Sequence, residues 1–203
     1  MKKLSFVVLT GAILFCSCGN GGNENKGTDS SGTISNKEGE AMVNQPDTSA
    51  KSPSATVDEK CVEFAVKAAN AGMKEIALGK WARENATNAD VKHFGSMMVE
   101  DHTKAADELK KIAKDKHINL PAEVTKETRE DIDKVKGKTG KDADKEYVDQ
   151  MVKDHKDAVD LFEDASKKAT DIDLKNFATK TLPTLMRHRD AIKAIKDKMD
   201  KMK

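Results

Sequence analysis

The chain has 203 residues, of which 35% are charged, with 36 lysines and arginines against 35 aspartates and glutamates. The two signs are evenly mixed and the net charge is +1, which excludes the strongly basic surface of a nucleic-acid-binding protein. Two of the three cysteines, Cys16 and Cys18, lie near the N-terminus, so Cys61 has no partner for an internal disulfide. The folded part must therefore be stabilised by packing or by a ligand.

The first residues have the pattern of an export signal. Residues 1–3 supply positive charge and residues 4–15 are apolar, a run too short to span a bilayer as a mature helix. The small Ser17 directly precedes Cys18, as lipoprotein signal peptidases require. We predict that residues 1–18 are a lipoprotein signal peptide with Cys18 as the lipid-attachment residue that binds the protein to a membrane. An ordinary secretory signal with incidental cysteines is the alternative.

A polar segment follows the signal. Residues 19–55 consist mainly of glycine, asparagine, serine, threonine, lysine and glutamate and contain no aromatic residue. Such a segment cannot bury enough apolar surface to fold, so we predict a disordered tether. No acidic run follows Cys18. This favours an exported lipoprotein of the outer membrane that faces the periplasm over one displayed on the cell surface.

Residues 56–203 are expected to form one all-α domain, a bundle of four helices. The first helix is predicted to begin at a capping box in residues 56–59. It has a stripe of small residues, spaced alternately by four and three, that contains a single carboxylate, Glu75. Gly72 and Gly79 lie on this stripe and are expected to let another helix or a bound group come close to Glu75.

The three later helices each have a histidine within the apolar stripe, at His102, His155 and His188. Residues 118–142 lie between the second and third helices, are long enough to cross the length of the bundle, and leave room for a short helix. In the last helix, Pro183 either introduces a kink or begins a new helical segment.

One residue near the midpoint of each predicted helix has a side chain that can bind a metal ion: Glu75, His102, His155 and His188. Midpoints meet whether neighbouring helices run parallel or antiparallel, so we expect these four residues to form one buried layer. An internal similarity supports this alignment, since residues 98–107 and 151–160 are identical at six of ten positions.

A layer of four buried polar groups is tolerated only if every group has a partner. One bound transition metal ion would satisfy all four, because neutral imidazoles and carboxylates are common ligands of zinc, copper and iron. Mutual hydrogen bonding with buried water is the alternative. The sequence thus leaves open a metal site and a purely structural layer.

Further residues beside two of the histidines could support a metal site. Asp101 and Asp154 could accept the remaining N–H of a neighbouring imidazole, or they could be ordinary surface aspartates. Met98 and Met151 precede two of the histidines by one turn. Thioethers beside imidazoles favour copper, whereas methionine is also a common filler of cores.

The anchor and tether, the Met-Val-x-Asp-His motif at residues 98–102, its repetition at 151–155, and the segment 181–188 together resemble a bacterial family, domain-of-unknown-function family 4142. Its members are exported proteins, often labelled predicted outer membrane proteins, and are assigned to the ferritin-like bundles. The resemblance implies a ferritin-like up-down four-helix bundle with a long crossover between the second and third helices.

The chain departs from the di-iron members of the ferritin-like class, which use Glu-x-x-His motifs. Val99, Val152 and Leu185 stand three residues before the three histidines. We therefore expect at most a single-ion site, without di-iron chemistry.

The function predicted from the sequence is that of a lipid-anchored cell-envelope protein, with one metal ion in the bundle core, that acts in metal handling or stress protection. The alternative is a non-catalytic structural or interaction module. We do not expect an enzyme, because no nucleophile or substrate pocket is visible in the sequence. The sequence does not identify a protein partner.

Overall fold

The structure is a computed structural model that describes residues 57–202. In this part the chain forms helices and no strand, as the sequence predicts: α1 (Glu59–Asn85), α2 (Ala89–Asp115), α3 (Lys126–Lys136), α4 (Gly140–Lys168) and α5 (Ile172–Lys201). The predicted signal peptide, the predicted tether and Cys18 lie outside the described residues. None of the described helices is long and apolar enough to cross a membrane.

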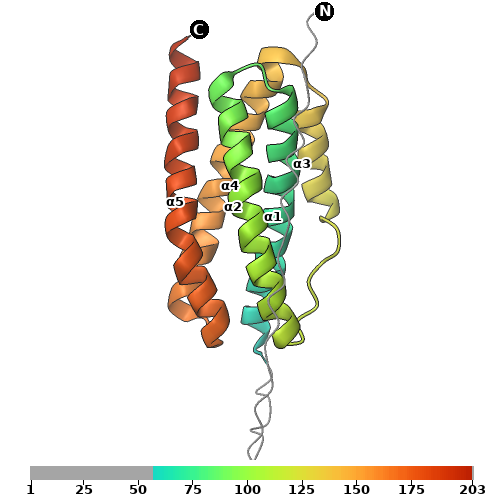
Figure 1. The fold of residues 1–203 in the computed structure, drawn as a ribbon, viewed down its shortest axis with the longest axis vertical. Helices are drawn as coiled ribbons and strands as arrows, with labels where there is room; N and C mark the ends of the chain where they lie inside the picture. The colour runs from blue at the N-terminus through green and yellow to red at the C-terminus, as the bar shows by residue number, and fades with distance from the viewer. Residues whose placement is uncertain (1–56, 203) are drawn as a thin grey trace, which may run out of the picture. The chain divides into compact units, whose positions relative to one another are not determined.

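The four long helices pack side by side as a helical bundle (Figure 1). α1 and α2 form one antiparallel hairpin and α4 and α5 form a second. The two hairpins contact each other through α1 with α4 and through α2 with α5. Each long helix is therefore antiparallel to the neighbours that it contacts.

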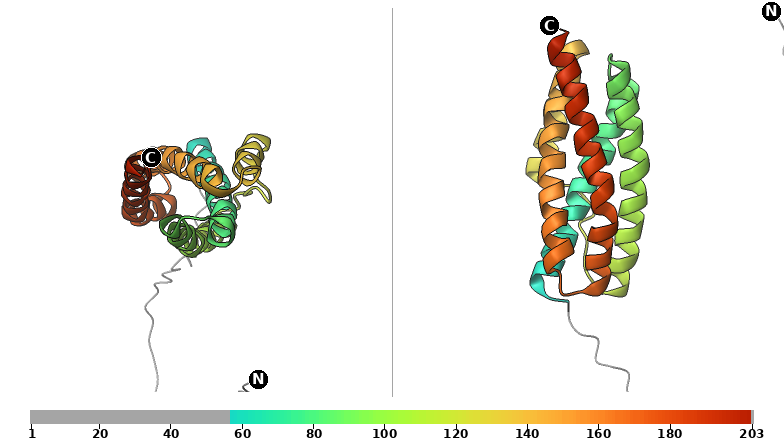
Figure 2. Two further views of the ribbon diagram at one scale, coloured as in Figure 1. Left: turned by 90° about the horizontal axis from the view of Figure 1, so that it is seen from above. Right: turned by 90° about the vertical axis from the view of Figure 1, so that its left-hand side faces the viewer.

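The predicted crossover is the segment between α2 and α4, and it contains a short helix, α3, as expected. α3 lies outside the ring of long helices, against α1 and α4 (Figure 2). Its first turn is fixed to α1 by Asn70, whose side chain donates to Thr128 Oγ1 at 2.9 Å and accepts from the Thr125 backbone N–H at 2.9 Å. Because α4 begins already at Gly140, the crossover is slightly shorter than the predicted 118–142.

Most helix starts follow the local sequence. Asn88 caps α2, since its side chain accepts from the backbone N–H groups of Asp90 and Val91. For α1 the predicted capping box is wrong. Asp58 is the N-cap and accepts from Cys61 N–H, because its carboxylate is placed to reach the third residue of the helix.

α5 runs unbroken from Ile172 to Lys201, so Pro183 lies inside the helix and does not begin a new segment. Pro183 is exposed. A proline ring on the solvent side does not collide with a neighbouring helix, and the carbonyl that lacks its N–H partner remains close to water.

The core consists of two apolar clusters on either side of the bundle's middle. One contains aromatic side chains from three helices, Phe64, Phe162 and Phe177. The other is built around Phe94, Tyr147 and their neighbours. Between the two clusters lie the four residues that the sequence places at the helix midpoints, called here the polar layer: Glu75, His102, His155 and His188.

α1 and α2 approach each other closely at a pair of glycines. A Cβ added to Gly79 would lie 2.8 Å from the Gly95 carbonyl oxygen, and one added to Gly95 would lie 2.7 Å from that of Gly79. At Gly79, one turn from Glu75, the expected close approach of a second helix is thus present. Gly72 is different, since a Cβ added there would meet nothing within 4 Å.

Candidate metal centre

Each long helix contributes one residue to the polar layer, and all four side chains are buried. Glu75 is 2% exposed, His102 is 6% exposed, and His155 and His188 are fully buried. The register of the helices explains this: each residue lies on the apolar stripe near the middle of its helix, and in an antiparallel bundle the middles coincide.

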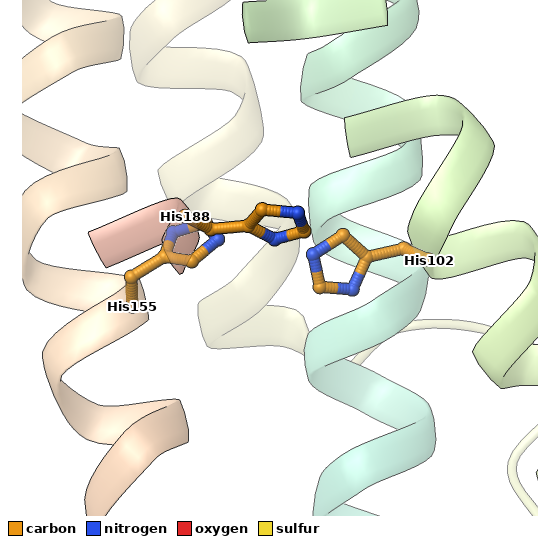
Figure 3. Close-up of side chains that lie close together, drawn as sticks. All are labelled: His102, His155 and His188. Carbon is orange, nitrogen blue, oxygen red and sulfur yellow. The ribbon is translucent and has the colours of Figure 1, made fainter. Parts of the chain in front are cut away.

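The three imidazoles point toward one another from different helices (Figure 3). One nitrogen from each ring lies within 4.8 Å of the other two. The carboxylate of Glu75 joins them from α1, with Oε2 at 3.1 Å from His102 Nδ1 and Oε1 at 3.6 Å from His155 Nε2. The structure therefore brings together all four residues that the sequence singles out.

Hydrogen bonds on the outer side of the layer fix the tautomers of two histidines. His155 Nδ1 lies 3.0 Å from the Met151 carbonyl oxygen, which only accepts, so Nδ1 carries the proton. His188 Nε2 lies 2.9 Å from Asp101 Oδ2 and donates to that carboxylate. In the neutral rings, His155 Nε2 and His188 Nδ1 are consequently unprotonated acceptors.

Four buried polar atoms of the layer have no hydrogen-bond partner among the described residues: Glu75 Oε1, His102 Nε2, His155 Nε2 and His188 Nδ1. The Glu75 carboxylate beside His102 Nδ1 favours the proton on that nitrogen, which leaves His102 Nε2 as an acceptor as well. The layer is thus rich in acceptors and poor in donors. Each unsatisfied buried group costs about 1 to 3 kcal/mol, so either a buried water or a bound ion would stabilise this layer.

Burial also shifts the protonation equilibria of the layer. Loss of solvation raises the pKa of Glu75 to about 7 and lowers the pKa values of His102 and His188 to about 4. The pKa of His155 is lowered by the same cause, against the attraction of Glu75. The imidazoles are therefore neutral at pH 7, which is the form that binds metal ions.

Of the two aspartates that were candidates to orient an imidazole, only Asp101 does so. Partial burial opposes ionisation of Asp101, but the hydrogen bond with His188 and the nearby Arg187 keep its pKa below the ordinary value. Arg187 Nη2 lies 3.3 Å from Asp101 Oδ2. Asp101, His188 and a bound ion would form the carboxylate–histidine–metal arrangement that is common in metalloproteins.

Asp154 has neither of the two roles left open for it, because its carboxylate is largely buried and pairs with Lys74 instead of an imidazole. Lys74 Nζ lies 2.9 Å from Asp154 Oδ1 and 2.6 Å from Asp131 Oδ2, and its side chain is only 8% exposed. Burial raises the pKa of Asp154, although Lys74 opposes this. The sequence pattern did not indicate a role for Lys74. Its position directly before Glu75, on a helix with a buried carboxylate, was the available signal.

Met98 and Met151 are fully buried in the apolar cluster that contains Phe94. The contribution of Met151 to the layer is its backbone carbonyl, which accepts from His155. Phe94, from the same cluster, covers one side of the polar layer. Its ring packs edge-on against His155 and His188 with centroid distances of 5.7 and 6.3 Å. Both methionines occupy positions of core packing.

Tyr147 is a further polar residue near the layer, and its sequence pattern did not indicate a role there. Its hydroxyl is buried and has no partner within residues 57–202. Burial, and then the negative charge of Glu75, raise the pKa of Tyr147. The only sequence signal is its place on the apolar stripe of α4, two turns before His155.

Comparison with known proteins agrees with this fold. The sequence profile of the family described as Domain of unknown function (DUF4142) matches residues 46–195. Among solved structures, the chain is similar to the crystal structure of a DUF305 fragment from Deinococcus radiodurans, with a TM-score of 0.61 and 10% sequence identity, over 68% of this chain and 96% of that chain. At this identity the likeness shows the fold alone. A search of curated proteins finds no match.

The family match covers most of the chain, including the whole polar layer, and it confirms the resemblance found in the sequence motifs. The chain belongs to the DUF4142 family.

Proposed function

We propose that this protein binds one transition metal ion in the core of a ferritin-like bundle, with His102, His155 and His188 as ligands and Glu75 as the fourth. The observation that carries the proposal is the group of three buried imidazoles, each with one nitrogen within 4.8 Å of the other two, beside the buried carboxylate of Glu75. In this layer four buried acceptor atoms lack partners among the described residues. A cation satisfies all four at once, whereas hydrogen bonding within the layer offers at most one further donor, a protonated Glu75, for three imidazole acceptors.

The geometry is close to that of a metal site. With zinc–nitrogen bonds of about 2.0 to 2.1 Å, nitrogens around a tetrahedral ion lie about 3.4 Å apart. The three imidazole nitrogens lie within 4.8 Å of one another, so each would move inward by roughly 1 Å, which side-chain rotation can supply. Zinc, copper and iron all accept this ligand set.

The proposal is limited to a single ion. Di-iron sites in ferritin-like proteins use several carboxylates, and this layer contains only Glu75. A single ion with three neutral imidazoles and one carboxylate fits a role in metal handling or stress protection in the cell envelope. No group in the layer has the arrangement of a nucleophile and its base, so we do not propose an enzyme.

Metal titration of the protein purified without a histidine tag tests the proposal. After chelator treatment, zinc, copper(II) and iron(II) are added separately, and bound metal is measured by elemental analysis. We expect one equivalent per chain, with a stability gain of about 3 to 4 kcal/mol at free metal concentrations of 100 to 1000 times Kd. A fully folded protein that takes up no ion and melts at the same temperature with each metal would contradict it.

The chain supplies a matched control for this titration. His93 and His117 are exposed and lie outside the polar layer. The double variant His93→Ala/His117→Ala should keep one equivalent of metal, whereas His155→Leu should lose it. Binding that disappears in the surface double variant would show that exposed histidines, and not the polar layer, hold the ion.

The alternative function is a structural or interaction module in which the layer only fixes the register of the helices. The outer hydrogen bonds of His155 and His188 to the protein favour this alternative, because they anchor both rings without an ion. It predicts that His155→Leu leaves function intact and stability equal or higher, since a buried unpaired acceptor is replaced by an apolar group of similar size.

We also propose that Cys18 carries the lipid anchor and that the protein resides at the periplasmic face of the outer membrane. The support is the sequence pattern, in which Ser17 precedes Cys18 after a short apolar run. Cys18→Ser is expected to move the protein from the membrane fraction to the soluble fraction. Cys16→Ser is the matched control and should stay with the membrane.

A further inference from the structure

A polar pocket of about 290 Å³ lies between α1, α3 and α4, and Glu75 forms part of its wall. The wall contains three further carboxylates, from Asp131 of α3 and from Asp154 and Asp157 of α4. The side chain of Asp131 is 43% exposed and that of Asp154 is 13% exposed, whereas Glu75 is buried. These three carboxylates therefore form a series from the surface to the polar layer.

The two oxygens of the Glu75 carboxylate face different helices. Oε2 lies 3.1 Å from His102 Nδ1 of α2, and Oε1 lies 3.6 Å from His155 Nε2 of α4. Oε1 has no hydrogen-bond partner among residues 57–202. Because α4 also forms a wall of the polar pocket, the pocket adjoins the polar layer on the side of this unpartnered oxygen.

A second pocket, called here the apolar pocket, also has Glu75 in its wall but is unsuited to a cation. It has a volume of about 260 Å³ and lies between α1 and α2, and most of its wall consists of small or aromatic side chains such as Gly72, Ala106 and Phe177. An ion that enters the bundle core loses bound water, which is costly unless other ligands replace it. Carboxylates offer this replacement in the polar pocket, whereas apolar walls do not.

The side chain of Lys74 lies between the outer and the inner carboxylates of the polar pocket. Its Nζ is 2.6 Å from Asp131 Oδ2 and 2.9 Å from Asp154 Oδ1, and the side chain is only 8% exposed. The ammonium thus occupies the place that a cation from solvent would pass on its way to Glu75. Lysine has a flexible four-carbon stem, so the ammonium can move out into solvent and return.

We propose that the metal ion enters and leaves the polar layer through the polar pocket, past Asp131 and Asp154 to Glu75, and that Lys74 is the gate of this route. The inference rests on the proposed metal site and concerns how that site exchanges its ion with solvent. When the ammonium moves outward, the ion takes its place at Asp154 and then passes to Glu75 Oε1. The returning ammonium closes the pocket and slows release of the ion.

The rate of metal release tests the gate. Protein loaded with zinc, or with copper(II) if zinc does not bind, is mixed with a large excess of a chelating dye, and the first-order loss of metal is followed by absorbance. Lys74→Gln should release the ion roughly tenfold faster, the factor expected when one charged hydrogen bond no longer has to break. Lys74→Arg keeps the charge and should release it at the wild-type rate.

The sign of the effect separates a gate from a nearby charge. If Lys74 only repelled the ion, its replacement by glutamine would tighten binding and slow release. Faster release in Lys74→Gln is therefore expected only if the ammonium blocks the route. An unchanged or slower release in this variant would overturn the proposal.

Charge reversals beside the two pockets compare the two routes. Asp131→Lys repels the Lys74 ammonium toward Asp154, so release should become about threefold slower. Asp107 pairs with Lys110, which lines the apolar pocket, so Asp107→Lys makes the same change of charge there and should leave the rate unchanged. Slower release in Asp107→Lys but not in Asp131→Lys would refute the polar route. This comparison also decides the question if Lys74→Gln does not fold.

Equilibrium titration distinguishes a failure of this inference from a failure of the proposed function. If the wild-type protein binds no metal ion, both proposals are wrong. If it binds one equivalent and the variants of Lys74 and Asp131 all release the ion at the wild-type rate, the metal site stands and the gate is wrong.

Discussion

At the scale of single residues, the two copies of the repeated motif differ in what their aspartates bind. Asp101 and Asp154 occupy the same place in their Met-Val-x-Asp-His segments. Asp101 accepts from His188 of α5, whereas Asp154 binds Lys74 of α1 and does not orient an imidazole. The sequence gives no reason to assign different roles to these two aspartates. Only the packing of the neighbouring helix decides which one reaches a histidine.

This difference yields a prediction with an internal control. Asp101→Asn should weaken metal binding by about 10- to 100-fold, because it removes the carboxylate that fixes the tautomer of His188. Asp154→Asn should leave metal affinity unchanged and lower stability, because Lys74 loses one of its two anionic partners. Competition with a chelator of known affinity measures both. Equal losses of affinity in the two variants would show that Asp101 has no special role.

At the scale of the elements, two glycines of one helix have opposite surroundings. Gly79 of α1 touches the backbone of α2, and Gly72 of α1 lines the apolar pocket of about 260 Å³ between α1 and α2. The sequence indicates that small residues matter on this stripe, yet it cannot tell a helix contact from a cavity. That distinction depends on where α2 and the crossover lie, which no local pattern contains.

Paired substitutions to alanine should therefore have effects of opposite sign. Gly72→Ala is expected to stabilise the protein by about 0.5 to 1 kcal/mol, since alanine is the better helix former and its methyl group has room. Gly79→Ala should destabilise by about 1 to 3 kcal/mol, because its Cβ would force α1 and α2 apart. Urea unfolding measures both changes. A stabilised Gly79→Ala would mean that the helices can separate without cost.

At the scale of the whole molecule, the helices, their order and the residues of the polar layer follow from apolar periodicity and from the helix midpoints. The sequence did not predict the pocket, the Lys74 network or the position of α3. These features depend on contacts between residues far apart in the chain, such as Lys74 with Asp131 and Asp154. Periodicity shows which face of a helix is buried, but not which neighbour covers it.

The charges of the polar layer predict a stability maximum of the metal-free protein near pH 6.5 to 7. His102 and His188 have pKa values of about 4 in the folded state against 6.5 ordinarily, so stability falls as pH drops from 6.5 toward 4. The pKa of Glu75 is about 7 in the folded state against 4.5 ordinarily, so protonated Glu75 favours the folded state. This contribution to stability is lost as pH rises from 4.5 through 7.

Below pH 6.5 the effect of the three histidines on stability is larger than the opposite effect of Glu75, so stability decreases as pH falls. Urea unfolding between pH 4.5 and 8 tests this. Bound metal should move the acid-side loss to lower pH, because the ion competes with protons for the imidazoles. A metal-free protein whose stability does not change between pH 6.5 and 4.5 would show that the histidines are not buried in their neutral form.

The division of the bundle into two hairpins gives the polar layer a mechanical consequence. Glu75 and His102 belong to the α1–α2 hairpin and His155 and His188 to the α4–α5 hairpin, and contacts within each hairpin far exceed those between them. An ion bound by all four would cross-link the two halves at mid-height. Cys61, the cysteine of the described domain, is free. The ion would then stabilise this domain as a cross-link, as disulfides stabilise many exported proteins. The persistence of this cross-link would depend on the supply of metal and not on redox conditions.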